Sequence, residues 1–348
     1  MHKHTRITLG TVGALALALS LVACSTGGHT PKPSGSDPTG EPTELITVNY
    51  SAPVPGALPF LPVDIAAAQG FFEEEGIELV VTQTSAQALP AALTSGQIDM
   101  TADTAYNVGR YLENGVEVRF VSGLNDNVDF TLLAADGVDI PGPDEVGGWR
   151  ASIEALRGLR IGTAAQAGPI GLTVAALLEE AGVEEGEYTF VDTPGAAAGN
   201  ALEAGQVDAV FSGGGFDAPL VANGLATHVL SLGTDIPDIF GDQVNAALTM
   251  TATFIEENPE APARVQRAIA RAMEYIQDPA NIDSVVADAI ASGTPETDEL
   301  AEKIQSYAYS AALSIDGIQA ALEWANRAGI SSTVIDANDS IAEGVETV

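Results

Sequence analysis

The side chains that most often carry out catalysis are scarce in this 348-residue chain. It has one cysteine and four histidines, of which only His228 lies beyond the first 29 residues. Neither a Gly-x-Ser-x-Gly nucleophile sequence nor a zinc-ligand spacing occurs. Isolated carboxylates such as Asp103 and Asp217 are more often helix caps or solvated groups than an acid–base pair. We therefore expect a protein that binds rather than catalyses, with no metal and no cofactor.

Four stretches that follow predicted strands have the composition of binding loops, because open α/β sheets bind ligands beyond the carboxyl ends of their strands. The loop at 51–61 is stiffened by proline and carries an aromatic ring. The loop at 101–104 offers hydroxyls and a carboxylate, which either contact a ligand or cap the next helix. The loop at 163–171 places a proline at a helix start, and 212–217 is glycine-rich without the Gly-Lys-Ser/Thr of a nucleotide loop. The candidate ligand-binding residues are Pro59, Phe60, Thr101, Asp103, Thr104, Gly168, Pro169, Ile170, Gly213, Phe216 and Asp217.

The single cysteine lies at the end of a segment with the features of a secretory signal peptide. Lys3 and Arg6 precede an apolar stretch at 7–22, which is short for a membrane span of about 20 apolar residues. The sequence Leu-Val-Ala-Cys that ends at Cys24 resembles a bacterial lipobox, which implies cleavage before Cys24 and acylation of its sulfur. We expect a signal peptide at 1–23 and an extracytoplasmic protein anchored to the cell membrane through lipid on Cys24.

The charge of the chain is strongly acidic. Lysine and arginine number 13 and aspartate and glutamate 48, a net charge of −35, and loss of Lys3 and Arg6 with the signal peptide makes it −37. We do not expect so acidic a chain to bind nucleic acid. Residues 24–44 are rich in Ser, Thr, Gly and Pro and predict a flexible tether. The expected state is a monomer.

Short apolar runs alternate with helical patterns over the rest of the chain, as in parallel sheets with crossover helices. An irregular stretch at 136–148 separates two such series, and a helical region follows residue 258. We therefore expect an α/β fold with two lobes, each a mostly parallel sheet with flanking helices. The predicted strands are 46–50, 78–82, 100–102, 118–124, 159–162, 188–191 and 209–212, and the predicted helices are 63–72, 88–95, 106–113, 170–181, 196–204, 261–277, 284–292, 298–306 and 315–328.

Two ten-residue stretches match each other across these series. Residues 91–100 and 200–209 share the order Ala-Leu, two further residues, Gly-Gln, Ile or Val, and Asp. In each, a helix ended by glycine leads into a buried strand past an aspartate. The repetition indicates paired lobes.

Together these residues resemble the nitrate/sulfonate/taurine and thiamine-pyrimidine-precursor group of ABC transporter solute-binding proteins. The elements that carry the resemblance are 67–79 (AAQGFFEEEGIEL), 92–99, 156–162 (LRGLRIG), 201–209 and 254–260 (FIEENPE). The resemblance implies a type II periplasmic-binding-protein-like fold, with lobe I from 45–134 and 245–348 and lobe II from 135–244. It also implies hinges near 132–136 and 243–249, a small-molecule ligand between the lobes, and an ABC permease with its ATPase as partners.

The identity of the ligand stays open at this point. Because Arg110 is the basic residue nearest the candidate loops, a pyrimidine or other heterocycle stacked on Phe60 or Phe216 is favoured over a sulfonate or nitrate. Backbone amides could still hold an anion. Two alternatives to transport are a lipid-anchored solute sensor and an enzyme similar to a eukaryotic pyrimidine synthase of this fold. That enzyme depends on histidine and a cysteine-rich motif, whereas this sequence has one cysteine and, beyond residue 29, one histidine.

Overall fold

The structure, a computed structural model, describes residues 45–85 and 87–348. The expected signal peptide at 1–23, the lipidation site Cys24 and the tether at 24–44 lie outside the described residues. The described residues belong to one compact unit, Thr43–Val348. None of the helices that the structure describes is long and apolar enough to cross a bilayer.

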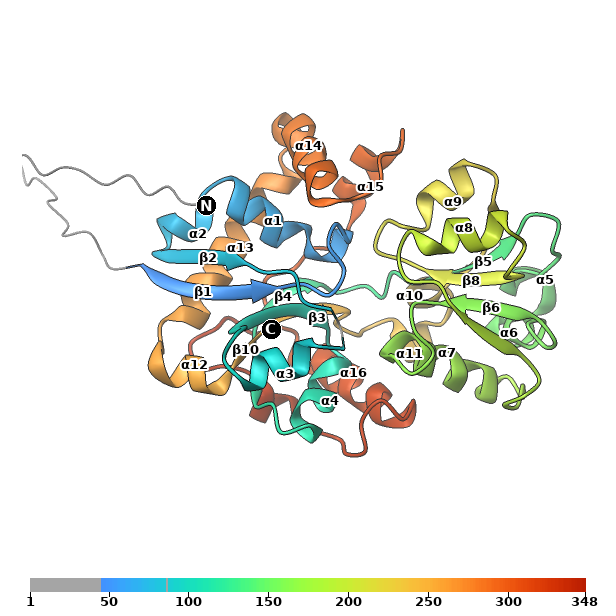
Figure 1. Cartoon of the computed structure of the whole chain (residues 1–348), viewed down its shortest axis with the longest axis horizontal. Coiled ribbons are helices and arrows are strands. Elements are labelled where there is room, and N and C mark those ends of the chain that lie inside the picture. Colours follow the sequence, from blue (N-terminus) through green and yellow to red (C-terminus); the bar gives the residue numbers. More distant parts are fainter. Residues whose placement is uncertain (1–44, 86) are drawn as a thin grey trace, which may run out of the picture. The chain divides into compact units, whose positions relative to one another are not determined.

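The first of two sheets has five strands in the order β2-β1-β3-β10-β4 (Figure 1). Four of them run in one direction, and β10 is antiparallel to both of its neighbours, β3 and β4. We call this sheet and the helices on its two faces the first lobe. Its strands are β1 (Ile46–Ser51), β2 (Ile77–Val81), β3 (Met100–Thr104), β4 (Val118–Asn125) and β10 (Ala246–Thr251).

The second sheet repeats this plan in the order β7-β6-β8-β5-β9. Here β5 is the antiparallel strand, paired with β8 and β9. This sheet and its helices form the second lobe. Its strands are β5 (Thr131–Ala135), β6 (Arg160–Thr163), β7 (Thr189–Asp192), β8 (Ala209–Ser212) and β9 (Ala226–Ser231). The expected fold class, two lobes that each hold a mostly parallel sheet, is confirmed.

Helices cover both faces of each sheet (Figure 1). Central strands covered on both faces are apolar almost throughout, and β10 is buried at every position. The first-lobe helices are η1 (Leu58–Phe60), α1 (Leu61–Ala68), α2 (Phe71–Glu74), α3 (Leu89–Thr94), α4 (Asn107–Glu113), α12 (Ala252–Glu257), α13 (Ala261–Gln277), η2 (Pro279–Asn281), α14 (Ile282–Ser292), α15 (Leu300–Ser306), α16 (Ile315–Arg327) and η3 (Ala337–Ser340). The second-lobe helices are α5 (Pro143–Val146), α6 (Trp149–Glu154), α7 (Pro169–Glu180), α8 (Ala197–Glu203) and α9 (Ala218–Ala222).

The matching stretches of the sequence occupy equivalent places in the two lobes. Strands β3 and β8 are each the third strand of their sheet. Asp99, just before β3, accepts hydrogen bonds from the backbone and side-chain nitrogens of Asn49 on β1, at 2.9 and 2.7 Å. Asp208, just before β8, accepts the same kind of pair from Arg160 on β6, at 2.8 Å from the backbone nitrogen and 3.0 Å from Nε. The repeated aspartate therefore joins the third strand of the sheet to the second, its neighbour, in both lobes.

The structure corrects the predicted passages of the chain between the lobes. All but the last residue of the hinge expected at 132–136, and the lobe boundary after residue 134, fall inside β5, which is held between β8 and β9. The first crossover is therefore 126–130. The second crossover, 232–245, contains α10 (Leu232–Asp235) and α11 (Pro237–Phe240), so most of the hinge expected at 243–249 is strand β10. The helix expected at 63–72 is two helices, because Gly70 adopts a left-handed conformation with φ of 76°.

Candidate functional site

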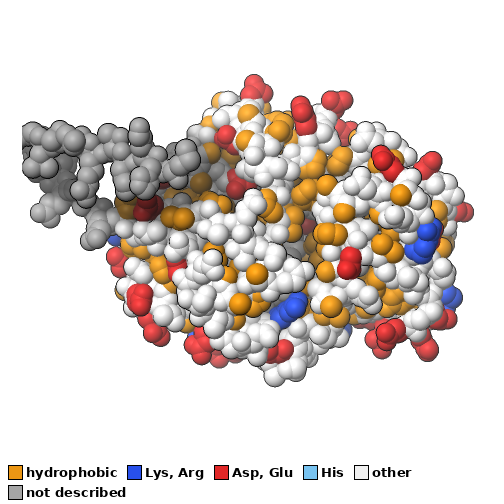
Figure 2. Space-filling view, viewed as in Figure 1, with side chains coloured by type: hydrophobic (Ala, Val, Ile, Leu, Met, Phe, Trp, Pro, Cys, Tyr) orange, Lys and Arg blue, Asp and Glu red, His pale blue; other side chains and the backbone are white. Residues whose placement is uncertain are grey.

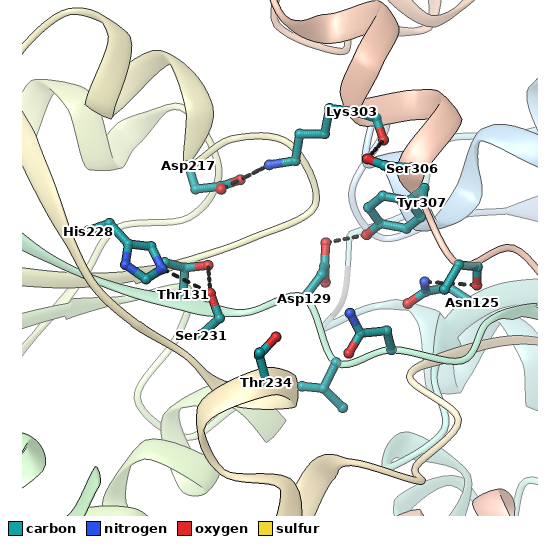
Figure 3. Close-up of a pocket in the computed structure, with 13 residues that line it drawn as sticks. Asn125, Asp129, Thr131, Asp217, His228, Ser231, Thr234, Lys303, Ser306 and Tyr307 are labelled. Atoms are coloured by element: carbon teal, nitrogen blue, oxygen red, sulfur yellow. Dashed lines mark hydrogen bonds and ion pairs between the residues drawn. The ribbon is translucent and has the colours of Figure 1, made fainter. Parts of the chain in front are cut away.

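A pocket of about 280 Å³ lies where the two crossovers meet the end of α15. Polar side chains from both lobes form most of its wall, and Figure 3 shows them pointing toward a common space. Its volume is close to the lower end of small-molecule pockets, about 300–1,000 Å³. The lining residues are Asn125, Asn127, Val128, Asp129, Thr131, Asp217, His228, Ser231, Thr234, Lys303, Ser306, Tyr307 and Ala308.

An ion pair joins the two lobes at this pocket. Lys303 Nζ, on α15 of the first lobe, lies 2.9 Å from both carboxylate oxygens of Asp217, which precedes α9 of the second lobe. The side chains are 30% and 17% exposed, so water screens the pair less than an ion pair at the surface. The ammonium group is thereby committed to a carboxylate of the chain itself.

Asp129, in the first crossover, is the second carboxylate of the pocket. It accepts hydrogen bonds from the backbone nitrogen of Gly214 at 2.7 Å, from Asn245 Nδ2 at 3.2 Å and from the Tyr307 hydroxyl. Burial raises the pKa of the Asp129 carboxyl, and the hydrogen bonds from Tyr307 and Gly214 oppose this rise. One carboxylate thus connects both crossovers, the loop after β8 and the segment after α15.

His228 and Ser231, both on β9, form the third group of the pocket. His228 Nε2 lies 2.9 Å from Ser231 Oγ, and the backbone nitrogen of Ser231 donates to Asp235 at 2.7 Å. Among the described residues, the other ring nitrogen of His228 donates no hydrogen bond to a carboxylate, so nothing orients this pair as a nucleophile and base. The described residues also contain no cluster of His, Cys, Asp or Glu that could hold a metal ion.

Of the sequence-predicted site residues, Asp217 is the one that lines this pocket. Two others of the same loop lie close to it and hold the lobes together. A Cβ on Gly213 would lie 2.8 Å from the Asp129 carbonyl oxygen, so glycine there permits close approach to the first crossover. Phe216 is half-buried and packs against the apolar core of the first lobe.

Pro59 and Phe60 are buried in packing beside this same glycine-rich loop, which Leu58 and Pro59 contact. Both lie in η1, next to Leu58, whose backbone nitrogen donates to the Gly214 carbonyl at 3.0 Å. Phe60 belongs to the apolar core of the first lobe. The first and fourth candidate loops therefore come together, but by interlobe packing rather than by lining the pocket.

The candidates after β3 contact the first lobe itself. Thr101 is buried and donates to the Ser51 carbonyl at 2.8 Å. Asp103 accepts hydrogen bonds from Asn107 Nδ2 and the Thr104 backbone nitrogen, each at 2.7 Å, and from the Tyr111 hydroxyl, so it ties the end of β3 to α4. The Thr104 hydroxyl is buried and has no hydrogen-bond partner among the described residues.

The third candidate loop starts helix α7. Gly168 is its N-cap residue, Pro169 occupies the first turn and Ile170 is buried in the core. The backbone nitrogen of Gln166, in the same loop, donates to Asp192 at 3.0 Å. These residues are not part of the pocket wall.

The sequence reasoning missed Lys303, which corrects the expectation that Arg110 is the basic residue nearest the candidate loops. Lys303 bonds directly to the candidate Asp217. A signal was present, because Lys303 is the only lysine after Lys32 in a chain with an excess of acidic residues. Nothing local in the predicted helix at 298–306 showed that it faces a loop 86 positions earlier in the chain.

Two α/β lobes joined by two crossovers, with a polar pocket where they meet, define a periplasmic-binding-protein-like fold. The profile of the NMT1-like family matches residues 56–291, and the chain belongs to that family. This confirms the resemblance that the sequence motifs indicated. A search of curated proteins finds no significant match.

Solved structures with this fold include several periplasmic binding proteins. The aliphatic sulphonate-binding protein SsuA of Escherichia coli is 13% identical with a TM-score of 0.67, over 87% of this chain and 98% of that one. The alkanesulfonate-binding protein SsuA of Xanthomonas axonopodis pv. citri, bound to MOPS, is 15% identical with a TM-score of 0.64, over 87% and 99%. The nitrate-binding protein NrtA of Synechocystis PCC 6803 is 16% identical with a TM-score of 0.57, over 70% and 66%.

Proposed function

We propose that this chain is an extracytoplasmic lipoprotein that captures a small solute between its lobes and delivers it to an ABC importer. Family membership and the binding proteins of the same fold support a solute-binding function. The pocket offers hydrogen-bonding groups but no oriented nucleophile among the described residues, which supports binding rather than catalysis. The permease and its ATPase are the partners proposed for delivery.

The observation that carries this proposal is the composition of the pocket wall. Asn125 and Tyr307 come from first-lobe segments, Thr131 and Ser231 from second-lobe strands, and Asp129 from a crossover. A solute that contacts all of them gains its full set of contacts only when the lobes are together. Binding therefore stabilises the closed arrangement by the difference in contacts between the two states.

Lobe closure can be measured with spin labels at exposed positions. Val81 on β2 and Val221 on α9 are 62% and 43% exposed. The protein carries Cys24→Ser, so that the only cysteines are the two introduced by Val81→Cys and Val221→Cys, which are then labelled. Amines, sulfonates, nitrate and heterocycles are added one at a time. A compound that binds should shorten the distance between the two labels. The control pair Val81→Cys/Val54→Cys lies within the first lobe and should not change. A solute that binds in the pocket and leaves both distances unchanged would contradict the proposal.

The proposed anchor has its own test. Cys24→Ser should release the exported protein from the membrane fraction, because the sulfur that accepts the lipid is gone. Solute binding by the released protein should be unchanged, since the pocket lies in Thr43–Val348. Membrane retention of exported Cys24→Ser protein would overturn the lipid anchor and leave the binding function standing.

A further inference from the structure

The one ammonium group among the described residues of the pocket wall and two backbone nitrogens beside the pocket are bonded to carboxylates of the chain itself. Lys303 is paired with Asp217. The backbone nitrogen of Gly214 donates to Asp129 at 2.7 Å, and that of Ser231 donates to Asp235 at 2.7 Å. An entering sulfonate or nitrate would have to displace a carboxylate from each of these donors.

The balance of charge in the pocket is negative. Among the described residues, its lining contains two carboxylates, Asp129 and Asp217, one ammonium group, Lys303, and no arginine. An anion near Lys303 would also approach Asp217, whose oxygens lie 2.9 Å from the same nitrogen. In a partly buried site, the repulsion between these like charges opposes the binding of an anion. For a positively charged solute, the two carboxylates attract and only Lys303 repels.

Asp129 has the features of a cation-binding carboxylate. Its three hydrogen-bond donors leave part of its acceptor capacity free, since a carboxylate has about four acceptor sites. Burial is the main cause of the raised pKa of Asp129, and the charge of the neighbouring Asp217 adds to it; a cation between the two carboxylates would relieve their repulsion. Figure 3 shows Asp129, Asp217 and the Tyr307 ring around one space, and an aromatic face adds attraction for a cation.

The charge of the whole chain acts in the same direction. The net charge is −35, and Figure 2 shows acidic side chains spread over the visible face with few basic ones among them. Such a field raises the rate at which cations arrive and lowers it for anions.

We propose that the solute bound between the lobes is an organic cation, a small polar molecule with a protonated amine held by Asp129 and Asp217. The proposal rests on the proposed solute-binding function and specifies its ligand class. Lys303 then determines specificity. Because it neutralises one of the two carboxylates, the pocket keeps one net negative charge, which selects a solute with a single positive charge.

The test compares amines and sulfonates of matched size. Calorimetric titration at constant ionic strength uses the ethyl to hexyl series of alkylammonium chlorides and the sodium alkanesulfonates of the same lengths. We expect the amines to bind and the sulfonates of equal length to bind more weakly or not at all. Tighter binding of the sulfonates, or no binding by any amine, would overturn the proposal.

Variants separate the pocket charges from the overall charge. Asp217→Asn should weaken amine binding by roughly ten- to a hundredfold, the effect expected for a charge-assisted contact, and should improve sulfonate binding because Lys303 is released. Lys303→Met should strengthen amine binding. Asp129→Asn should weaken it, with circular dichroism used to check that the variant folds.

Glu154→Gln is the matched control, because this exposed residue of α6 carries the same charge and is not part of the pocket wall. Equal effects of Glu154→Gln and Asp217→Asn would mean that only the overall charge acts, and the proposal would fail. Sulfonate-driven closure of the spin-labelled protein would overturn the cation proposal and leave the solute-binding function intact. If no solute of either charge binds or closes the lobes, both proposals fall.

Discussion

At the scale of single residues, the chain uses buried and partly buried carboxylates as connectors. Asp99 and Asp208 each join two strands within a lobe, and Asp129 joins both crossovers to segments of the two lobes. Each accepts at least two hydrogen bonds, which compensates the cost of removing a carboxylate from water. A carboxylate with fewer donors should reveal that cost.

Asp64 on α1 is such a group. Burial raises its pKa to about 6 from the usual 3.8, and a hydrogen bond from Ser292 only partly opposes this. The folded protein therefore holds this proton more tightly than the unfolded chain, so its contribution favours folding at low pH and is lost as pH rises from about 4 through 6. Asp64→Asn should raise the free energy of unfolding at pH 7.5 by up to about 3 kcal/mol, at about 1.4 kcal/mol per pKa unit.

Urea unfolding between pH 4 and 8 measures this effect. The gain in Asp64→Asn should shrink steadily as the pH falls from 6 toward 4. Asp298→Asn, at an exposed position before α15, serves as a control and should show no such trend. A gain that does not change with pH would mean that the cost of the buried charge is not its cause.

At the scale of elements, close backbone contacts position the first loop against its neighbours. Gly56, before η1, has φ of 75°, and its carbonyl accepts a 2.8 Å hydrogen bond from Thr294 Oγ1 after α14. A Cβ on Gly56 would lie 2.3 Å from the Gly293 carbonyl carbon. The position therefore needs glycine both for its backbone conformation and for space.

We predict that Gly56→Ala costs on the order of 3 kcal/mol in unfolding free energy, from left-handed strain and overpacking together. Gly137→Ala is the matched control, since Gly137 has φ of 78° and no described residue has an atom within 4 Å of its would-be Cβ. It should cost about 1 kcal/mol, the strain alone. Chemical denaturation measures the unfolding free energy of the two variants. Equal losses would contradict the prediction, because they would show that the backbone at Gly293 shifts to accommodate the added methyl group at little cost.

The sequence predicted the elements better than the site, for physical reasons. Parallel strands and their helices have local apolar patterns, and the repeated Gly-Gln-x-Asp order identified β3 and β8 as equivalent. Strands β5, β9 and β10 were not predicted. Each pairs antiparallel with strands brought by distant segments, and nothing local distinguishes them from a connecting run. The pocket was harder still, because α15 and the first crossover are about 170 residues apart and meet only after both lobes form.

At the scale of the whole molecule, self-repulsion follows from the net charge of −35. The range of charge interactions falls from about 30 Å at 0.01 M salt to about 3 Å at 1 M. Raising NaCl from low to high concentration should therefore increase the unfolding free energy, on the order of 1 kcal/mol or more. Urea titrations at several salt concentrations measure it. The increase should be smaller at pH 4.5, where fewer carboxylates are charged, and a salt effect of equal size at both pH values would contradict this account.

The position of β10 has a consequence for the order in which the protein folds. This strand lies between β3 and β4, yet it follows the whole second lobe in the chain. The first sheet stays incomplete until residue 251 has emerged, whereas the second sheet is built from the continuous segment 131–231. Contacts between distant segments form late because closing a long loop costs entropy. The half of the molecule that begins the chain is thus expected to finish folding last, and until then β3 and β4 present unpaired edges that attract other chains.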